Sequence, residues 1–442
     1  MKYMILLYCM MLSGSVLGQV NIIRDKKTNK TQIQVEPLKP EVEYFDAFVW
    51  TSEMPSDCPF PQSDAFHQIR FLGIKSGFRY GDTFYPAWAE DDLMYSPWTD
   101  GATWRLDGSW ELCISDCIYL DEKHSSTGQA VIEGNDPLNL VVYSLGTQRA
   151  SAAPYQGRYP CGSLLHNGVW YYGTYCLAPS GKTPYGDMMV NWPWLGPFVG
   201  FRTSTDKGLN WRDCPHTPEN PIFGETGLYG HPVKIGAPHF IDFGKNMEHS
   251  PDGKAYMLAH GADIHDKMPR FWNHSWITGD QIYLLRVTPS VENINDATKW
   301  EFYAGKDGQG NAIWTSDFKD IQPLLEWNNN MGCVTATYNA PLKKYLMCIT
   351  DGGNTCSKMN TYIMESDSLT GQWNLIAYLK DFGEQAYFVN IPSKFISPDG
   401  QTMWLMYSGN FVTDWNGEQI KVNPPGSHYG LVMQKIKIIK NE

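Results

Sequence analysis

Residues 81–101, GDTFYPAWAEDDLMYSPWTDG, combine large aromatic rings with carboxylates in one short segment. The rings include Trp88 and Trp98, and the acidic side chains are Asp82, Glu90, Asp91, Asp92 and Asp100. Aromatic rings stack on sugar faces and carboxylates accept hydrogen bonds from hydroxyls, so we expect Trp88, Trp98, Glu90, Asp91 and Asp92 to contact a carbohydrate. The alternative is a Trp-rich strand pair with a polar turn, because polar groups in an aromatic setting describe many kinds of site.

The acidic side chains of this segment also suggest glycoside hydrolysis. Hydrolysis by two carboxyl groups requires one acid on each side of the scissile bond. Glu90, Asp91 or Asp92 could form such a pair with Asp82 or Asp100, but the spacing selects no particular pair.

Histidines are the other candidates for proton transfer, because imidazole titrates near neutral pH. Five stand near turns or beside the aromatic segment: His67, His166, His231, His239 and His249. Their spacing matches no strong metal-binding template, although some of them could hold a structural metal ion. We expect that the protein requires no cofactor. The sequence contains no nucleophile elbow, phosphate loop or dinucleotide fingerprint.

The elements that must position these residues are short strands. Apolar runs of four to seven residues, rich in Val, Ile, Tyr and Trp, alternate with Gly, Asn, Asp and Pro turns, as in an all-β protein. The clearest runs are residues 168–177, 198–204, 254–261, 281–287, 343–350, 360–367 and 402–409.

One turn pattern recurs along the chain and predicts a repeat fold. STDKGLNW (204–211) is an Asp-box turn, looser copies lie at 98–104, 294–300 and 366–373, and SPDG occurs at 250–253 and 397–400. Repeats of about 40–60 residues built from short strands indicate a β-propeller. About 400 residues at that period give a seven-bladed β-propeller, with two β-sandwich domains as the alternative.

The first residues predict export. Residues 1–18 have a Lys, an apolar run and then small residues, as in a secretory signal peptide cut before Gln19. We therefore expect a single catalytic domain at 19–442 in a periplasmic or extracellular protein, with no membrane span. Export permits disulfides, and Cys113–Cys117 or Cys161–Cys176 could pair, although small buried thiols are the simpler interpretation.

The net charge of −12 argues against nucleic acid and anionic membranes as partners. Charged residues make up only 19% of the chain, whereas aromatic residues reach 14% and there are 40 glycines. This composition favours an extracellular all-β protein over a helical or disordered one.

Five long motifs, in order, resemble one group of secreted proteins. They begin at Tyr80, Gly157, Gly196, Lys234 and Trp276, and include GRYPCGSLLHNGVWYYGTY and KIGAPHFIDFGKNMEHSPDGKAYMLAHG. Together they are similar to the seven-bladed propellers of marine and gut bacteria that comprise ulvan lyases, L-rhamnose-α-1,4-D-glucuronate lyases and related α-L-rhamnosidases. The resemblance covers about residues 45–435 and implies an acidic plant or algal polysaccharide or oligosaccharide as substrate, contacted also by Arg158, His231 and His239.

Within this group, the lyases abstract the proton at C5 of a uronic acid. The resemblance assigns His166 and Tyr229 to the lyase His and Tyr, and Lys245 to a position where the lyases carry Arg. A two-pronged carboxylate clamp would then be replaced by a point charge, which is not a conservative change. This departure weakens the interpretation as a polysaccharide lyase.

The rhamnosidases of the group work at the opposite face of the ring and depend on one His. The resemblance implies His67 as that base in an exo-acting α-L-rhamnosidase that removes L-rhamnose α-1,4-linked to D-glucuronic acid in arabinogalactan-type glycans. This hydrolase is our leading hypothesis, the lyase is the second, and a glycan-binding propeller without turnover is the third.

Overall fold

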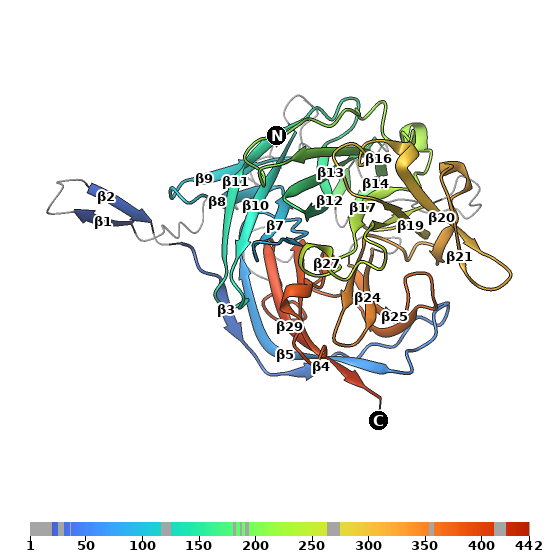
Figure 1. Cartoon of the computed structure of the whole chain (residues 1–442). Helices are drawn as coiled ribbons and strands as arrows, with labels where there is room; N and C mark the ends of the chain where they lie inside the picture. The colour runs from blue at the N-terminus through green and yellow to red at the C-terminus, as the bar shows by residue number, and fades with distance from the viewer. Residues whose placement is uncertain are drawn as a thin grey trace.

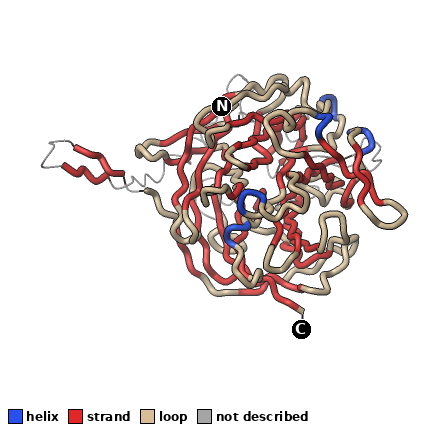
Figure 2. The backbone as a smooth tube through the Cα atoms, viewed as in Figure 1, coloured by secondary structure: helices blue, strands red, loops and turns tan. Residues whose placement is uncertain are grey.

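The computed structural model describes residues 20–24, 31–35, 37–115, 125–179, 183–185, 188–190, 194–262, 275–352, 358–410 and 421–441. The predicted signal peptide, Cys9, Cys117 and Cys356 lie outside these residues. Nearly all regular structure in the described part of the chain is strand (Figure 2), so the all-β prediction is confirmed. All seven of the predicted apolar runs form strands.

Five antiparallel sheets stand around one centre, as the blades of a propeller do (Figure 1). From the axis outward, the first contains β6 (Ala87–Trp88), β7 (Met94–Trp98), β10 (Ser126–Glu133) and β11 (Val141–Arg149). The second contains β12 (Arg158–His166), β13 (Val169–Ala178) and β16 (Trp194–Ser204). The third contains β17 (Gly236–Phe240), β18 (Ala255–Gly261), β19 (Gln281–Val287), β20 (Trp300–Lys306), β21 (Ala312–Thr315) and β22 (Pro323–Glu326).

The fifth sheet closes the ring by pairing the two ends of the chain. The fourth sheet contains β23 (Val334–Asn339), β24 (Lys344–Asp351), β25 (Asn360–Ser366) and β26 (Asn374–Leu379). The fifth contains β27 (Gln385–Asn390), β28 (Thr402–Asn410), β29 (Leu431–Lys440), β5 (Phe66–Phe78), β3 (Glu41–Tyr44) and β4 (Phe48–Val49). The C-terminal β29 pairs with β28 on one side and with the N-terminal β5 on the other, so both edges of β29 are hydrogen-bonded.

Smaller elements lie outside the five sheets. They are the strand pairs β1 (Val20–Arg24) with β2 (Thr31–Val35), β8 (Gly101–Trp104) with β9 (Trp110–Cys113), and β14 (Thr183–Tyr185) with β15 (Met188–Val190). Single turns of 3-10 helix are η2 (Leu228–Gly230), η3 (Lys245–Met247), η4 (Ala297–Lys299), η5 (Phe318–Asp320) and η6 (Ser393–Phe395). The β1–β2 pair projects away from the ring in Figure 1.

The β-propeller prediction is confirmed, but the described residues form five blades and not the predicted seven. The predicted period of about 40–60 residues was too short. The innermost strands begin at Ala87, Arg158, Gly236, Val334 and Gln385, so most blades carry long connections between their strands.

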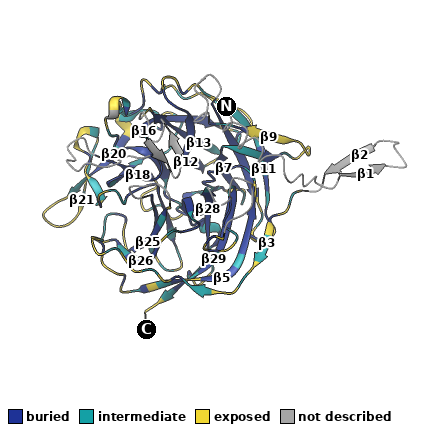
Figure 3. Cartoon of the chain, turned by 180° about the vertical axis from the view of Figure 1, so that it is seen from behind, coloured by how far each residue is buried: buried dark blue, intermediate teal, exposed yellow. Residues whose placement is uncertain are grey.

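Aromatic and aliphatic side chains fill the space between neighbouring sheets. Trp98, Trp170, Trp300 and Trp373 are fully buried, and Figure 3 shows burial concentrated in the strands of the ring. Cys161 and Cys176 are buried in different hydrophobic clusters and are not joined by a disulfide, so the predicted bridge between them does not form. Cys113 is also free and buried.

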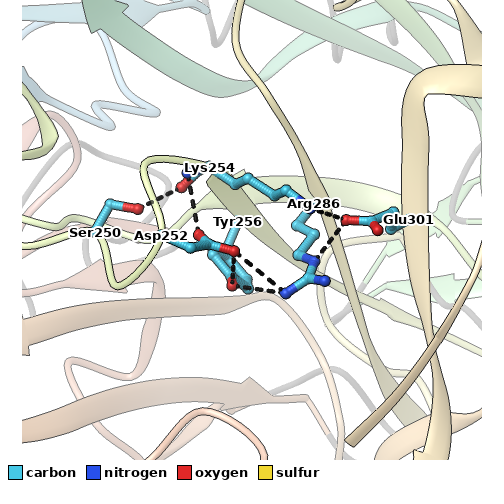
Figure 4. Close-up of polar contacts among 6 residues, drawn as sticks. All are labelled: Ser250, Asp252, Lys254, Tyr256, Arg286 and Glu301. Carbon is cyan, nitrogen blue, oxygen red and sulfur yellow. Dashed lines mark hydrogen bonds and ion pairs between the residues drawn. The ribbon is translucent and has the colours of Figure 1, made fainter.

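A polar network on the outer part of the third sheet begins at an SPDG turn (Figure 4). Asp252 of that turn accepts hydrogen bonds from Tyr256 at 3.1 Å and from Arg286 at 3.4 Å. Glu301 accepts one from Arg286 Nε at 2.8 Å and another from Lys254. The guanidinium of Arg286 also lies 3.8 Å from the centre of the Trp314 ring.

We expect Arg286→Ala to lower the free energy of unfolding by about 1–2 kcal/mol. The change removes cation–π contacts with Trp314 and Tyr256 and two partly exposed ion pairs, each worth less than about 1 kcal/mol. Urea denaturation measures the loss. Arg286→Lys keeps the charge without the planar fork and should give a smaller loss; a loss equal to that of Arg286→Ala would show that the planar fork, and not the charge, stabilises the fold.

Candidate functional site

The innermost strands run parallel around the axis, so the ring has two chemically distinct ends. Thr335 and Thr337 of β23 donate hydrogen bonds to the carbonyls of Val389 and Ile391, next to the matching part of β27. Asn390 in turn donates to the carbonyl of Phe84, which precedes β6. We call the end where these strands begin the N-terminal end and the other the C-terminal end.

The predicted acidic cluster lies at the C-terminal end, in the turn after β6, and lysines neutralise it. Lys207 Nζ lies 3.0 Å from Glu90 and 2.7 Å from Asp91. Asp92 Oδ1 is 3.2 Å from Lys245 Nζ and accepts a hydrogen bond from the Trp88 indole at 3.0 Å. These carboxylates therefore form ion pairs with lysines, and each keeps part of its surface exposed.

A second lysine reaches the same turn from the fifth sheet. The Lys394 side chain is only 4% exposed; its ammonium donates to the carbonyl of Asp92 and lies 3.8 Å from Oδ2. Lys245 and Lys394 each place Nζ 5.9 Å from the centre of the Trp88 ring. The Trp88 ring, which we expected to stack on a sugar, therefore lies beside two lysine ammonium groups.

The residues implied by the lyase resemblance do not form one constellation. His166 ends β12, where Nδ1 lies 3.1 Å from the carbonyl of Asn246 and Nε2 lies 2.9 Å from the Asn167 amide. Lys245 is close to this end of the ring, in η3. Tyr229 lies in η2, in the connection that leads to the start of β17, and it is 95% exposed. Since strands advance about 3.3 Å per residue, β12 and β17 hold Tyr229 at the opposite end from His166 and Lys245.

The residue implied by the rhamnosidase resemblance lies at the periphery. His67 is exposed on β5, which is the fourth strand from the axis in the fifth sheet. The structure therefore does not bring His67 to either end of the axis.

The remaining predicted site residues are scattered. Trp98 is completely buried beneath Gly128, whose hydrogen leaves room for the indole, so this ring packs in the core and has no exposed surface for a substrate. Arg158 is buried between the first two sheets, and His231 is exposed beyond η2. His249 lies near the C-terminal end, 3.8 Å from Glu248.

His239 lies in the middle of the ring and is 3% exposed. Its ring centre is 4.0 Å from that of Tyr85, and neither ring nitrogen has a hydrogen-bond partner among the described residues. Burial and the nearby His260 lower the pKa of His239 to about 3, so the imidazole is neutral at neutral pH.

A cavity follows the axis from this histidine toward the C-terminal end. It has about 380 Å³ of space, part of which is open solvent, and its wall includes Tyr85, His239, Asp242, Thr337 and Asn390. Asp242 accepts hydrogen bonds from the backbone and hydroxyl of Ser393, both at 2.7 Å, and from Gly244 N at 2.9 Å. With its oxygens held by these donors, Asp242 links the third and fifth sheets.

The most perturbed carboxyl group of the aromatic segment lies nearer the N-terminal end. Asp82 precedes β6 and is 5% exposed. Tyr387 of β27 donates a hydrogen bond to Oδ2, and the Thr83 hydroxyl donates to Oδ1 at 2.8 Å. Burial, followed by the negative charge of Asp100, raises the pKa of Asp82 to about 8, so this acid holds its proton at neutral pH.

Asp100 lies beside Asp82 because their segments pair. The backbone of Asp82 exchanges two hydrogen bonds with that of Thr99, at 2.9 and 3.0 Å. The Asp100 carboxylate accepts from the Ser115 amide at 2.9 Å and from its hydroxyl at 2.7 Å. The two acids of the opening motif are therefore neighbours in different environments, which is how proteins separate a proton donor from a charged carboxylate.

The backbone at both acids is strained. Thr83 has a φ of 65° and Asp100 a φ of 41°, in the left-handed region that β-branched residues in particular avoid. Such conformations persist only when the surrounding structure holds them, and they concentrate at functional sites.

Aromatic side chains from three other sheets surround this acid pair. Tyr387 lies 5.6 Å from Trp276, which lies 6.3 Å from Tyr159, and Tyr159 lies 5.6 Å from Tyr175. The hydroxyl of Tyr175 is buried and has no hydrogen-bond partner among the described residues. All four rings belong to the largest hydrophobic cluster of the described residues, so the acid pair lies against an apolar, nearly water-free environment.

Sequence reasoning missed the residues that come from distant strands. Tyr387 and Trp276 stand in apolar runs that also read as ordinary strands, so their contact with the first blade could not be predicted from spacing. Asp82 and Asp100 were visible, but nothing in the sequence distinguished them from Asp91 or Asp92.

The described residues contain neither a cluster of metal ligands nor a membrane-spanning helix. No group of three or more His, Cys, Asp or Glu residues is arranged to hold a metal ion in the described part of the chain. Within those same residues, no helix has the length and apolar character of a membrane-spanning segment.

Comparisons with known proteins give only distant structural similarity. No family model and no curated protein sequence matches the chain. Similar solved structures include a protein of unknown function from Dyadobacter fermentans, with 12% identity, 90% of this chain and 99% of that chain covered, and a TM-score of 0.40.

Two others are enzymes. The α-L-arabinofuranosidase from Podospora anserina has 10% identity, covers 82% of this chain and 92% of its own, and gives a TM-score of 0.38. A β-xylosidase/α-arabinofuranosidase from a compost microbial metagenome has 13% identity, coverage of 83% and 94%, and a TM-score of 0.40. At these values the similarities assign neither a family nor an activity, and the propeller rests on the strand pairing itself.

Proposed function

We propose that this protein is a glycoside hydrolase whose acid pair is Asp82 and Asp100. The observation that carries the proposal is the protonated, buried Asp82 next to a carboxylate held by Ser115. Glycoside hydrolysis requires one carboxylic acid and one carboxylate around the scissile bond. Asp82 and Asp100 provide one protonated acid and one carboxylate side by side. The other acids considered from the sequence, Glu90, Asp91 and Asp92, are ion-paired with lysines.

In the proposed reaction, Asp82 gives its proton to the glycosidic oxygen as the bond between that oxygen and the anomeric carbon breaks. Water adds to the anomeric carbon, and its proton passes to Asp100, so that both products are neutral at the cleaved bond. The Tyr387 hydroxyl, which donates to Asp82 Oδ2, stabilises the carboxylate that forms on Asp82.

For the substrate we propose the rhamnose-capped acidic glycans implied by the sequence resemblance, with release of L-rhamnose from D-glucuronic acid. The exported location implied by residues 1–18 agrees with a polymeric substrate outside the cell. A β-eliminating lyase has less support, because Tyr229 stands at the other end of the ring from His166 and Lys245.

Incubation with a rhamnose-capped arabinogalactan tests this function. We expect free rhamnose to accumulate without the ultraviolet absorbance of a 4,5-unsaturated uronate, because hydrolysis creates no double bond. Rising absorbance would instead identify a lyase. Saturable glycan binding with neither product would identify a sugar-binding propeller and overturn the enzymatic proposal.

A further inference from the structure

Two arginines are buried between the first and second sheets, and the backbone amide of Arg158 donates at 3.1 Å to the carbonyl of Ser115, which also holds Asp100. Arg158 begins β12 and is 8% exposed, and Arg202 lies on β16 and is 7% exposed. Arginine is almost never this deeply buried unless a counter-charge pairs with it.

The two side chains lie on the same face of the second sheet. Arg202 is opposite Tyr172 in the strand register, and Arg158 Nε donates at 3.0 Å to the hydroxyl of Thr174. Tyr172 and Thr174 are two residues apart on β13, so both point toward the first sheet and their Cα atoms are about 7 Å apart. Tyr172 also donates a hydrogen bond to the carbonyl of Gly128 on β10, which confirms this direction.

Neither guanidinium forms an ion pair with a carboxylate of the described residues. The hydrogen bonds of Arg158 go to neutral acceptors, the Thr174 hydroxyl and the Ser151 carbonyl at 3.1 Å. Arg202 has one long contact of 3.4 Å to the Gln129 amide, and its buried Nε has no acceptor in the part of the chain that the structure describes.

Aromatic rings compensate only part of the charge of Arg202. Its guanidinium carbon lies 3.8 Å from the centre of the Tyr172 ring and 4.9 Å from that of Trp211. A cation–π contact offsets only part of the free energy that burying a charge costs. Burial, together with the nearby positive charge of Arg158, lowers the pKa of Arg202 to about 10, so the Arg202 side chain is a cation at neutral pH.

We propose that a small monovalent anion of halide size binds between the first two sheets, held by Arg158 and Arg202. The anion would accept the unused N–H groups of both forks and offset two buried positive charges with one negative charge. More than nine-tenths of each arginine is shielded from solvent. A small halide ion can reach such a buried position more readily than the carboxylate of a bulky glycan, so we favour a halide. The inference is independent of the proposed hydrolase.

The test compares thermal unfolding of the full chain in sodium chloride or bromide with unfolding in sodium methanesulfonate at the same ionic strength. A ligand that binds only the folded state raises the midpoint, and we expect a rise of about 1–3 °C in the halides. Arg202→Met removes the charge at similar length and should abolish the rise. Arg286→Met, at an arginine paired with Glu301, should keep it.

Crystals soaked in sodium bromide provide a measurement that does not depend on a variant. We expect an anomalous bromide peak between Arg158 and Arg202, also if Arg202→Met fails to fold. The proposal is overturned if the midpoint is the same in all three salts, if Arg202→Met keeps the halide effect, or if no peak is found. Stabilisation by D-glucuronate but not by halides would replace the small ion by a sugar carboxylate and would also overturn it.

Discussion

Asp82→Asn is expected to lower the rate of rhamnose release by about 100- to 10,000-fold, the usual contribution of a positioned general acid. An amide cannot supply the proton that the leaving oxygen needs. The fold should survive, because Asp82 is already neutral below its pKa of about 8 and Asn is neutral as well. Initial rates on the capped glycan, measured at pH 6 to 7, give the comparison.

The expected structural cost of this substitution is small. Tyr387 and Thr83 both donate hydrogen bonds to the Asp82 carboxyl, and the Asn amide can accept only on its oxygen, so one bond is lost at about 1 kcal/mol. Circular dichroism and the thermal midpoint establish that the variant is folded.

Two control variants separate the acid pair from the other candidates. Glu90→Gln makes the same carboxyl-to-amide change in a residue that only pairs with Lys207, and it should keep full activity. His67→Ala, on the exposed side of β5, should also keep it. If Asp82→Asn remains active while His67→Ala is inactive, the catalytic centre lies at the flank of the fifth sheet and our assignment is wrong.

Much of the fold could be predicted from the sequence, because the strand signal is local. The run 281–287 coincides with β19, and the SPDG turns before β18 and β28 have Gly253 and Gly400 at φ values of 76° and 71°, as their turns require. The number of blades could not be predicted, because the strand count per sheet varies and β5 joins β29 across the whole length of the chain.

The candidate site was predicted only in part, because charge pairing is not local. Glu90, Asp91 and Asp92 look like free acids in the sequence, and their partners Lys207, Lys245 and Lys394 come from three other sheets. The sequence therefore predicts that acidic and aromatic residues lie close together. Which of the acids form ion pairs depends on contacts between distant sheets.

The same long-range packing determines the protonation of Asp82. Its burial depends on Tyr387, more than three hundred residues away, and the strain at Thr83 and Asp100 is a property of the closed ring. Neither could be deduced from the motif GDT alone.

The protonation of Asp82 also predicts how stability changes with pH. In the unfolded chain this carboxyl ionises near 3.8, whereas in the folded protein it ionises near 8. Between these values the folded state binds one more proton than the unfolded state, so Asp82 makes the free energy of unfolding fall as pH rises. The slope is about 1.4 kcal/mol per pH unit, which amounts to several kcal/mol by pH 8.

Asp82→Asn should remove this contribution, so its stability relative to the original protein should rise steadily from about pH 4 to about pH 8. Urea denaturation of both proteins across this range measures the difference. Other titrating groups, such as the buried His239 and His260, act equally in both proteins and cancel. A difference that does not change with pH would show that Asp82 is ionised in the folded protein, and the proposed proton donor would be lost with it.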